Sequence, residues 1–273
     1  SMSIASQSTQ ACLPRWWRCS RVTFTGIGNG DGAPWWRGAS TMQPRSARSS
    51  SENDFTPALG HAALTPLYDS AIALLTRERR WRAALLRQVA PTSDDVILDV
   101  GCGTGTLALM LKQAAPNATV IGLGPDPDVL ARAAKRARHA GLTIEFAKGF
   151  ARDVERFTGC GVTKVVSSLV FHQVPMEEKR AALGAMRAIL QPKGEAHIAD
   201  YGLQRTRLMR LLFAQVQMLD GKENTTPNAQ GILTRLMAEA GFAKVVETEV
   251  IATATGSISL YRGKAAGNRG AQA

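Results

Sequence analysis

The stretch ILDVGCGTGTLAL, residues 97–109, decides the fold class. The run VILDV (96–100) is short and almost wholly apolar, which is typical of a strand buried in a parallel sheet. Three glycines follow at every second position, Gly101, Gly103 and Gly105, and the apolar run behind them predicts a helix. A strand, a glycine-rich turn and a helix N-terminus together let a ligand approach the backbone and meet free N–H groups.

The spacing of the glycines distinguishes two kinds of nucleotide-binding turn. Dinucleotide-binding turns have the pattern GxGxxG, in which the third glycine permits close helix–strand packing and the pyrophosphate rests on the helix N-terminus. In this chain the third glycine comes one residue early, and Thr106 stands where that pattern requires glycine. The spacing therefore disfavours an enzyme that uses a nicotinamide or flavin cofactor.

Strands and helices alternate along the rest of the chain. The apolar patterns predict further strands at residues 118–123, 142–147, 163–171 and 194–202, and helices at 65–89, 106–115, 125–141, 177–190, 205–219 and 229–241. Pro91 ends the first helix, Asp126 is the expected N-cap of the third, and residues 220–228 are expected to form a polar loop. Residues 244–254 and 257–262 alternate with period two, which predicts an antiparallel pair at the sheet edge. The fold class is therefore α/β, a doubly wound and mainly parallel sheet with an antiparallel C-terminal hairpin.

Residues 1–55 differ in composition from the rest of the chain. They are rich in Ser, Gly and Arg and show no helical or strand period, so we expect them to be disordered or non-native. We assign an N-terminal helical cap to residues 56–93, the main domain to 94–264 and a disordered tail to 265–273. Six arginines and one acid in the first 50 residues fit a mitochondrial presequence, and GC-rich coding bias would produce the same composition.

Composition limits the other function classes. The chain has 273 residues, 45% of them apolar, and no apolar run approaches the roughly 18 residues of a membrane span. Its four cysteines are scattered without metal-ligand spacing, so we expect no metal site and a reducing, cytoplasmic compartment. The net charge of +11 is spread over the N-terminal segment and three helices without interleaved aromatic residues. This disfavours a nucleic-acid partner, while another anionic partner and association with a membrane surface stay open.

At this point the motifs resemble a known family. ILDVGCGTG is similar to the first motif of class I S-adenosylmethionine-dependent methyltransferases. SSLVFHQV (167–174) and ILQPKGEAHIADYG (189–202) resemble the segments around strands four and five of the ubiquinone/menaquinone and related small-molecule methyltransferases. The resemblance covers about residues 61–264. It implies a seven-stranded Rossmann-like sheet and methyl transfer from S-adenosylmethionine to a small-molecule or lipid-like acceptor.

The resemblance assigns cofactor contacts by position. Gly101, Cys102 and Gly103 would lie against the methionine part and the ribose of the cofactor. Asp99 would orient the turn or meet the cofactor's amino group, and a purely structural role is the alternative. The resemblance also implies that Phe150 packs the adenine ring and that Ala151 caps its amino group; core packing is the alternative for Phe150. Ser167 and Ser168 would contact the cofactor or satisfy hydrogen bonds at the end of a strand, and Tyr68 would touch the cofactor or line the acceptor pocket.

The chain departs from the family pattern at two places. The second strand of the family normally ends in an acid that binds both ribose hydroxyls, and here that position is Gly124. Asp126, two residues later, would reach the ribose or serve only as the helix N-cap. Val162-Thr163 replaces the usual Phe-Asp pair before strand four, which concerns support of the strand more than cofactor contact.

Methyl transfer by in-line displacement requires mainly that donor and acceptor are held in line and that water is excluded. A base is needed only for a protonated acceptor, and His172, after the fourth strand, is the candidate, with a structural role as the alternative. Tyr201, after the fifth strand, is the second catalytic candidate and would line the acceptor pocket or touch the cofactor. The Asn/Asp-Pro-Pro-Tyr/Phe motif of nucleic-acid amino-group methyltransferases is absent after strand four, which disfavours base acceptors. The alternative function is a degenerate protein of the same fold that binds the cofactor weakly or not at all and has a regulatory or scaffolding role.

Overall fold

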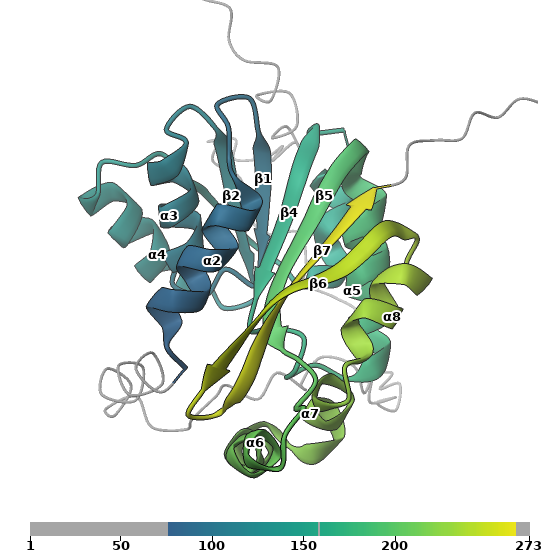
Figure 1. Ribbon diagram of the computed structural model, residues 1–273. Coiled ribbons are helices and arrows are strands. Elements are labelled where there is room, and N and C mark those ends of the chain that lie inside the picture. Colours follow the sequence, from purple (N-terminus) through teal and green to yellow (C-terminus); the bar gives the residue numbers. More distant parts are fainter. Residues whose placement is uncertain (1–75, 158, 266–273) are drawn as a thin grey trace, which may run out of the picture. The chain divides into compact units, whose positions relative to one another are not determined.

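A computed structural model describes residues 76–157 and 159–265, which form a seven-stranded sheet with helices on both faces (Figure 1). The strand order is β3-β2-β1-β4-β5-β7-β6, as the sequence predicts for a doubly wound sheet with a terminal hairpin. Strands β1 to β5 pair in parallel, β7 pairs antiparallel with β5, and β6 pairs antiparallel with β7 at the sheet edge. The strands are β1 (Val96–Val100), β2 (Thr119–Gly124), β3 (Glu145–Lys148), β4 (Val162–Ser168), β5 (Leu190–Tyr201), β6 (Phe242–Thr253) and β7 (Gly256–Ala265).

The helices form two layers around the sheet. Helices α2 (Glu78–Val89), α3 (Thr106–Ala114) and α4 (Pro127–His139) cover one face, and α5 (Met176–Ile189) and α8 (Ile232–Glu239) cover the other (Figure 1). The 3-10 helix η2 (Ala151–Phe157) packs into the same core as α5 and α8. Helices α6 (Arg207–Asp220) and α7 (Lys222–Ala229) follow β5 and lie at the end of the sheet where the β6–β7 turn is found (Figure 1). None of the helices described between residues 76 and 265 is long and apolar enough to cross a membrane.

The order of the strands reverses between β1 and β4. From β1 the sheet extends to β2 and β3 on one side, and from β4 it extends to β5 on the other. The carboxyl ends of β1 and β4 therefore lie side by side at the switch point. Ligands of open α/β sheets bind in the crevice outside the strands at such a point. The sheet itself is apolar on both faces: Leu98 and Val100 of β1 pack into one core, and Ile97 packs into the other.

Two predicted elements are wrong. Residues 220–228, expected to be a polar loop, contain helix α7. Its polar side chains have partners: the Thr225 hydroxyl donates to the Gly221 carbonyl (2.6 Å), and the Asn228 amide donates to the Tyr201 carbonyl (3.2 Å). These contacts compensate for the low hydrophobicity on which the prediction rested. The fourth strand, predicted to reach residue 171, ends at Ser168, because Leu169 has a φ of 55° and leaves the extended conformation.

Local helix signals are confirmed where the structure describes them. The side chain of Asp126 caps α4 by accepting the backbone N–H groups of Asp128 (2.8 Å) and Val129 (3.2 Å). Helix α2 ends at Val89, two residues before Pro91, as predicted. The start of that helix near residue 65, the segment 1–55 and most of the predicted tail lie outside the described residues, and β7 includes Ala265.

Candidate functional site

The glycine turn after β1 has the conformation that only glycine adopts without strain. Gly101, Gly103 and Gly105 have φ values of 74°, 52° and 77°. The backbone N–H groups of Gly101 and Cys102 both donate to the Leu123 carbonyl at the end of β2, at 2.8 and 2.9 Å. A Cβ atom at Gly101 would lie 2.2 Å from Cγ2 of Val170, in the segment after β4, whereas one at Gly103 would meet nothing within 4 Å. The turn therefore joins the ends of β1 and β2 and packs against the segment that follows β4.

Asp99 is a buried acid at the carboxyl end of β1. Its side chain is fully buried, and neither carboxylate oxygen has a hydrogen-bond partner of normal geometry within the described residues. Burial raises the pKa of Asp99 to about 7, although the positive charge of Arg82 opposes the rise. An unsatisfied buried polar group costs folding free energy. A ligand that brings a cationic donor to the carboxyl end of β1 would remove that cost.

Cys102 completes this side of the turn. The residue is 8% exposed, and its sulfur lies 3.8 Å from the position of a Cβ atom built on Gly124. Burial raises the pKa of the thiol, and the neighbouring Asp99 carboxylate raises it further. Cys102 is therefore a neutral packing group and not a reactive thiolate.

The two serines at the end of β4 have different surroundings. The hydroxyl of Ser167 is buried and donates to the Val100 carbonyl (2.9 Å), so it satisfies a strand end. The hydroxyl of Ser168 lies 3.4 Å from a guanidinium nitrogen of Arg82. Arg82 is also paired with Glu78 on the same helix, at 2.5 Å. Helix α2 thus places a cation between the ends of β1 and β4.

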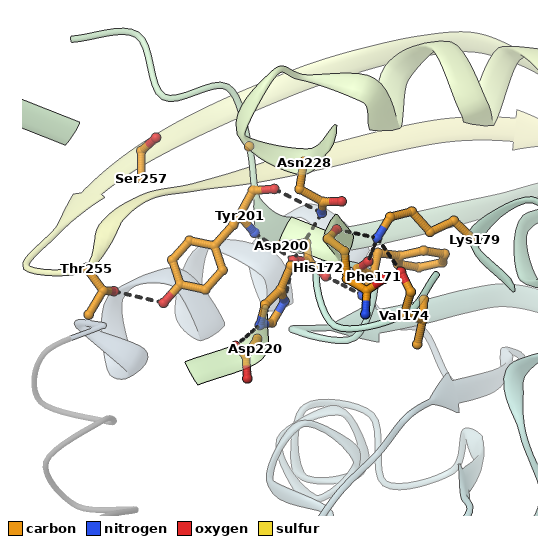
Figure 2. A network of polar contacts seen from close by, with 12 residues as sticks. Phe171, His172, Val174, Lys179, Asp200, Tyr201, Asp220, Asn228, Thr255 and Ser257 are labelled. Carbon is orange, nitrogen blue, oxygen red and sulfur yellow. Dashed lines mark hydrogen bonds and ion pairs between the residues drawn. The ribbon is translucent and has the colours of Figure 1, made fainter. Parts of the chain in front are cut away.

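His172 is held between two carboxylates (Figure 2). Its Nδ1 atom lies 2.8 Å from Asp200, and its Nε2 atom lies 3.4 Å from Asp220, the last residue of α6. Burial alone would lower the pKa of His172, but the charges and hydrogen bonds of the two aspartates outweigh it and raise the pKa to about 9. His172 is therefore protonated at neutral pH and both ring nitrogens donate. This favours the structural alternative for His172 over general-base catalysis.

Lys179 fastens the same segment from the other side. Lys179 is fully buried, and its Nζ atom donates to the carbonyls of Phe171 and Val174 (2.6 Å) (Figure 2). It also donates to the Asn224 carbonyl (2.9 Å). Burial lowers the pKa of Lys179 to about 8. One ammonium group thereby ties the residues after β4 to helix α7.

Tyr201 lies next to His172 and is equally enclosed. The side chain is 4% exposed, and its ring stands edge-on to the His172 ring with centroids 4.9 Å apart. Its hydroxyl and the Thr255 hydroxyl are 2.8 Å apart (Figure 2). On its other side the ring packs against Phe213 of α6, at 5.0 Å between centroids. Tyr201 therefore links β5 to α6 and to the β6–β7 turn.

Part of the chain matches known proteins in sequence. Residues 97–194 match the family described as "Methyltransferase domain". Over 140 residues the chain is 32% identical to the demethylmenaquinone methyltransferase of Thermus thermophilus, a match that covers 50% of this chain and 62% of that relative. Residues 97–194 of the chain therefore form a methyltransferase domain. The chain spans less than two thirds of the length of the Thermus relative.

Solved structures agree with the fold of the methyltransferase domain. An O-methyltransferase family protein from Burkholderia thailandensis matches with a TM-score of 0.57 and 18% identity, over 75% of this chain and 60% of that one. The magnesium protoporphyrin IX methyltransferase of Synechocystis, solved with bound SAH, matches with a TM-score of 0.53 and 15% identity, over 68% of this chain and 83% of that one. At such identities the likeness establishes the fold alone.

At the end of β2 the methyltransferase domain can accommodate a side chain at Gly124 and a second contact by Asp126. A Cβ atom on Gly124 would lie 3.2 Å from Cδ2 of Leu130, the end of a flexible side chain, and the backbone there is not in the left-handed region. Asp126 caps α4 through Oδ1 only, and Oδ2 makes no hydrogen bond within the described residues. The cap and a second contact through Oδ2 are therefore compatible. At the other departure, the Thr163 hydroxyl donates to Asp95 (2.7 Å) and so supports the start of β4.

Phe150 and Ala151 of the domain follow β3. The Phe150 side chain is 41% exposed, so the core-packing alternative is wrong for this residue. The guanidinium of Arg152 lies 4.8 Å from the ring centroid, and the Phe150 N–H donates to the Asp153 carboxylate (2.7 Å). Ala151 begins η2 and packs against the core. An exposed ring held by its neighbours offers an open stacking face.

Sequence reasoning missed the groups that control the His172 side of the domain. Asp200 is the last residue but one of β5, as Asp99 is of β1. That shared position at the end of a buried strand could have identified Asp200 from the sequence. Nothing in the local sequence marks Arg82, Lys179 or Asp220. Tyr68 lies outside the described residues. Within residues 76–157 and 159–265, no group of three His, Cys, Asp or Glu side chains could hold a metal ion.

Proposed function

We propose that this chain is an S-adenosylmethionine-dependent methyltransferase that acts on a small-molecule or lipid-like acceptor. The observation that carries the proposal is Asp99, a fully buried carboxylate beside a turn that requires glycine; within the part of the chain that the structure describes, its oxygens have no hydrogen-bond partner of normal geometry. S-adenosylmethionine, when bound, supplies an electrophilic methyl group on a sulfonium sulfur. It also carries a positively charged ammonium group that could pair with the Asp99 carboxylate. The residues present therefore fit this cofactor.

We assign the cofactor contacts of the chain as follows. Asp99 would accept hydrogen bonds from the ammonium group, because neither of its oxygens has a hydrogen-bond partner of normal geometry among residues 76–157 and 159–265. The backbone of Gly101 to Gly103 would lie against the methionine part and the ribose, since side chains are missing at Gly101 and Gly103. The free oxygen of Asp126 would accept a ribose hydroxyl in place of the acid absent at Gly124. The exposed ring of Phe150, with Ala151, would hold the adenine.

His172 and Tyr201 are proposed as positioning residues and not as the base. A histidine whose pKa is raised to about 9 keeps its proton at neutral pH and cannot take one from the acceptor. Instead, His172 and Tyr201 hold the residues after β4 against α6 and the β6–β7 turn. The chain therefore suits an acceptor that is nucleophilic in its own ionisation state, which needs alignment and exclusion of water more than proton transfer. The Thermus relative is named as a demethylmenaquinone methyltransferase, which supports a lipid-like acceptor.

The proposal is tested by calorimetric titration with S-adenosylhomocysteine, together with transfer of labelled methyl from S-adenosylmethionine to a panel of quinol, phenol and lipid acceptors. We expect binding by the wild type and loss of binding in Gly101→Arg, because a side chain there meets Val170. The matched control is Gly184→Arg, since Gly184 on α5 has open space around its Cβ position. Absence of binding by the wild type would reject the proposal and favour the alternative, a degenerate protein of this fold with a regulatory or scaffolding role.

A further inference from the structure

Helix α6 has apolar side chains on two opposite faces. Phe213 and Val216 are buried against the core. On the other side four large apolar side chains are exposed to solvent; they are Leu208 (63%), Leu211 (70%), Met218 (83%) and Leu219 (63%). We call these four residues the α6 outer stripe. They are half of the eight exposed large hydrophobic residues among the described residues, so the exposure is concentrated on this one helix.

The spacing of the outer stripe places its members together. Positions 208, 211, 218 and 219 fall within one third of the circumference of a helix with 3.6 residues per turn. The helix of 14 residues is roughly 21 Å long at 1.5 Å per residue. In Figure 1, α6 lies beyond the end of the sheet at which the β6–β7 turn is found. A continuous exposed apolar surface of this kind marks an interaction site more often than a lone exposed leucine does.

The charges beside the outer stripe are mainly positive. Arg207 and Arg210 lie along one edge, and neither forms an ion pair within the described residues; Arg210 donates to the Gln204 carbonyl (3.2 Å). Arg205, just before the helix, is paired with Glu247. The acid of the helix, Asp220, faces His172.

Charges beyond the end of α6 do not change the sign of this edge. Lys222 and Glu223 follow α6 and are both exposed, with opposite charges. The unpaired charge that accompanies the outer stripe is therefore that of Arg207 and Arg210. A surface that covers the stripe would place anionic groups beside these two guanidinium groups.

We propose that the α6 outer stripe docks the protein on an anionic lipid surface. A helix that lies in a membrane interface buries leucine-type side chains among the acyl chains and keeps arginines at the head groups, which is the pattern of this helix. Each arginine near an anionic leaflet strengthens binding by about fivefold. A protein partner is the less suitable occupant, because a stable interface covers about 800 Å² on each side and the stripe is one helix wide. The proposal does not depend on methyl transfer.

Helix α6 contacts the residues at the carboxyl end of the sheet. Asp220, its last residue, contacts His172 in the segment after β4, and Phe213 contacts Tyr201. A membrane against the outer stripe would therefore lie close to the carboxyl end of the sheet. Acceptors dissolved in the membrane would have a short path to that edge.

The test is flotation of the full chain with vesicles of phosphatidylcholine alone and of equal parts phosphatidylcholine and phosphatidylglycerol. We expect binding to the mixed vesicles and at least about tenfold weaker binding by Leu211→Gln/Met218→Gln, because two exposed apolar anchors are lost. Arg207→Gln/Arg210→Gln should weaken binding to the mixed vesicles by about 30-fold and leave binding to phosphatidylcholine unchanged. The control is Val246→Gln/Val250→Gln, which changes two exposed apolar residues of β6.

Circular dichroism of each variant verifies that it is folded. The proposal is overturned if the wild type does not bind the mixed vesicles or if Leu211→Gln/Met218→Gln binds them as well as the wild type. It is also overturned if the β6 control loses as much vesicle binding as Leu211→Gln/Met218→Gln. Sedimentation velocity tests the alternative that a second copy of the chain covers the outer stripe. A wild-type dimer that ignores vesicles and that Leu211→Gln/Met218→Gln converts to a monomer would assign the outer stripe to a second copy and overturn the proposal.

Discussion

His172 donates from Nδ1 to the Asp200 carboxylate over 2.8 Å, and both side chains are inaccessible to solvent. Asp200 also accepts the backbone N–H groups of Phe171 and Tyr201, each at 2.7 Å. One carboxylate near the end of β5 therefore orients a histidine, the segment after β4 and the last residue of β5. The arrangement explains why the segment after β4 keeps a fixed path although Leu169 has a φ of 55°.

Stability should fall with rising pH through His172. The pKa of this residue is raised to about 9 in the folded state, above its ordinary value of 6.5. Its contribution is therefore fully present below about pH 6.5 and is lost between there and about pH 9, with a size of up to about 3 kcal/mol. Urea unfolding of the wild type and of His172→Gln at several pH values measures the difference.

The His172 comparison needs the variant because Lys179 titrates in the same range. Burial lowers the pKa of Lys179 to about 8, so the stability that it contributes rises as it loses its proton. The difference between wild type and His172→Gln removes most of that effect. A difference that stays constant from pH 6 to pH 9.5 would contradict the assignment of a buried imidazolium.

Asp99→Asn should stabilise the ligand-free protein and weaken cofactor binding. The pKa of Asp99 is raised to about 7, so the ionised acid costs up to about 4 kcal/mol at pH 8 relative to the unfolded chain. The same charge is what we expect the ammonium group of the cofactor to require. Thermal unfolding and calorimetric titration with S-adenosylhomocysteine measure both effects.

The control for Asp99 is Asp94→Asn, an exposed acid five residues earlier in the chain. It should change neither quantity. Binding by the wild type should also strengthen as pH rises through about 7, when Asp99 ionises. An Asp99→Asn variant that binds S-adenosylhomocysteine as tightly as the wild type would remove Asp99 from the proposed contacts.

Gly101→Ala should destabilise the fold more than Gly103→Ala. Both positions have positive φ, which costs an alanine about 1–2 kcal/mol. Only at Gly101 would the new Cβ meet a neighbour, Cγ2 of Val170 at 2.2 Å, which adds about 1–3 kcal/mol. Urea unfolding of the two variants measures the difference. In the Val170→Ala background the clash is removed, so there Gly101→Ala should cost only as much unfolding free energy as Gly103→Ala does in the wild type. Equal costs for the two single variants would show that Val170 yields freely.

Gly124→Asp should bind S-adenosylhomocysteine more tightly, by about tenfold, if the added carboxylate accepts the ribose hydroxyls. The structure tolerates the change, because the Cβ atom would press only on the flexible end of Leu130. Asp126→Ser is the companion variant, since serine keeps the helix cap and lacks a second oxygen. Calorimetric titration should show weaker binding by Asp126→Ser. Unchanged affinity in both variants would place the ribose elsewhere.

Much of the fold could be predicted because its signals are local. The VILDV run forms β1 at the residues predicted for it, since five almost wholly apolar residues before a glycine turn have the length of a buried strand and are too short for a typical helix. The cap of α4 at Asp126 depends on two N–H groups within three residues. Helix α7 could not be predicted, because its polar residues are held by distant backbone groups such as the Tyr201 carbonyl.

The sequence by itself determined the order of the elements, the glycine turn at Gly101 and the kind of ligand that its spacing suits. Only the tertiary structure decided the ionisation of the candidate residues. His172 is charged because an aspartate 28 residues away is brought within 2.8 Å, and Asp99 resists charge because the fold buries it without a partner. A pKa depends on burial and on charges that the fold assembles, so residue type and spacing could nominate these groups but not state which of them holds a proton.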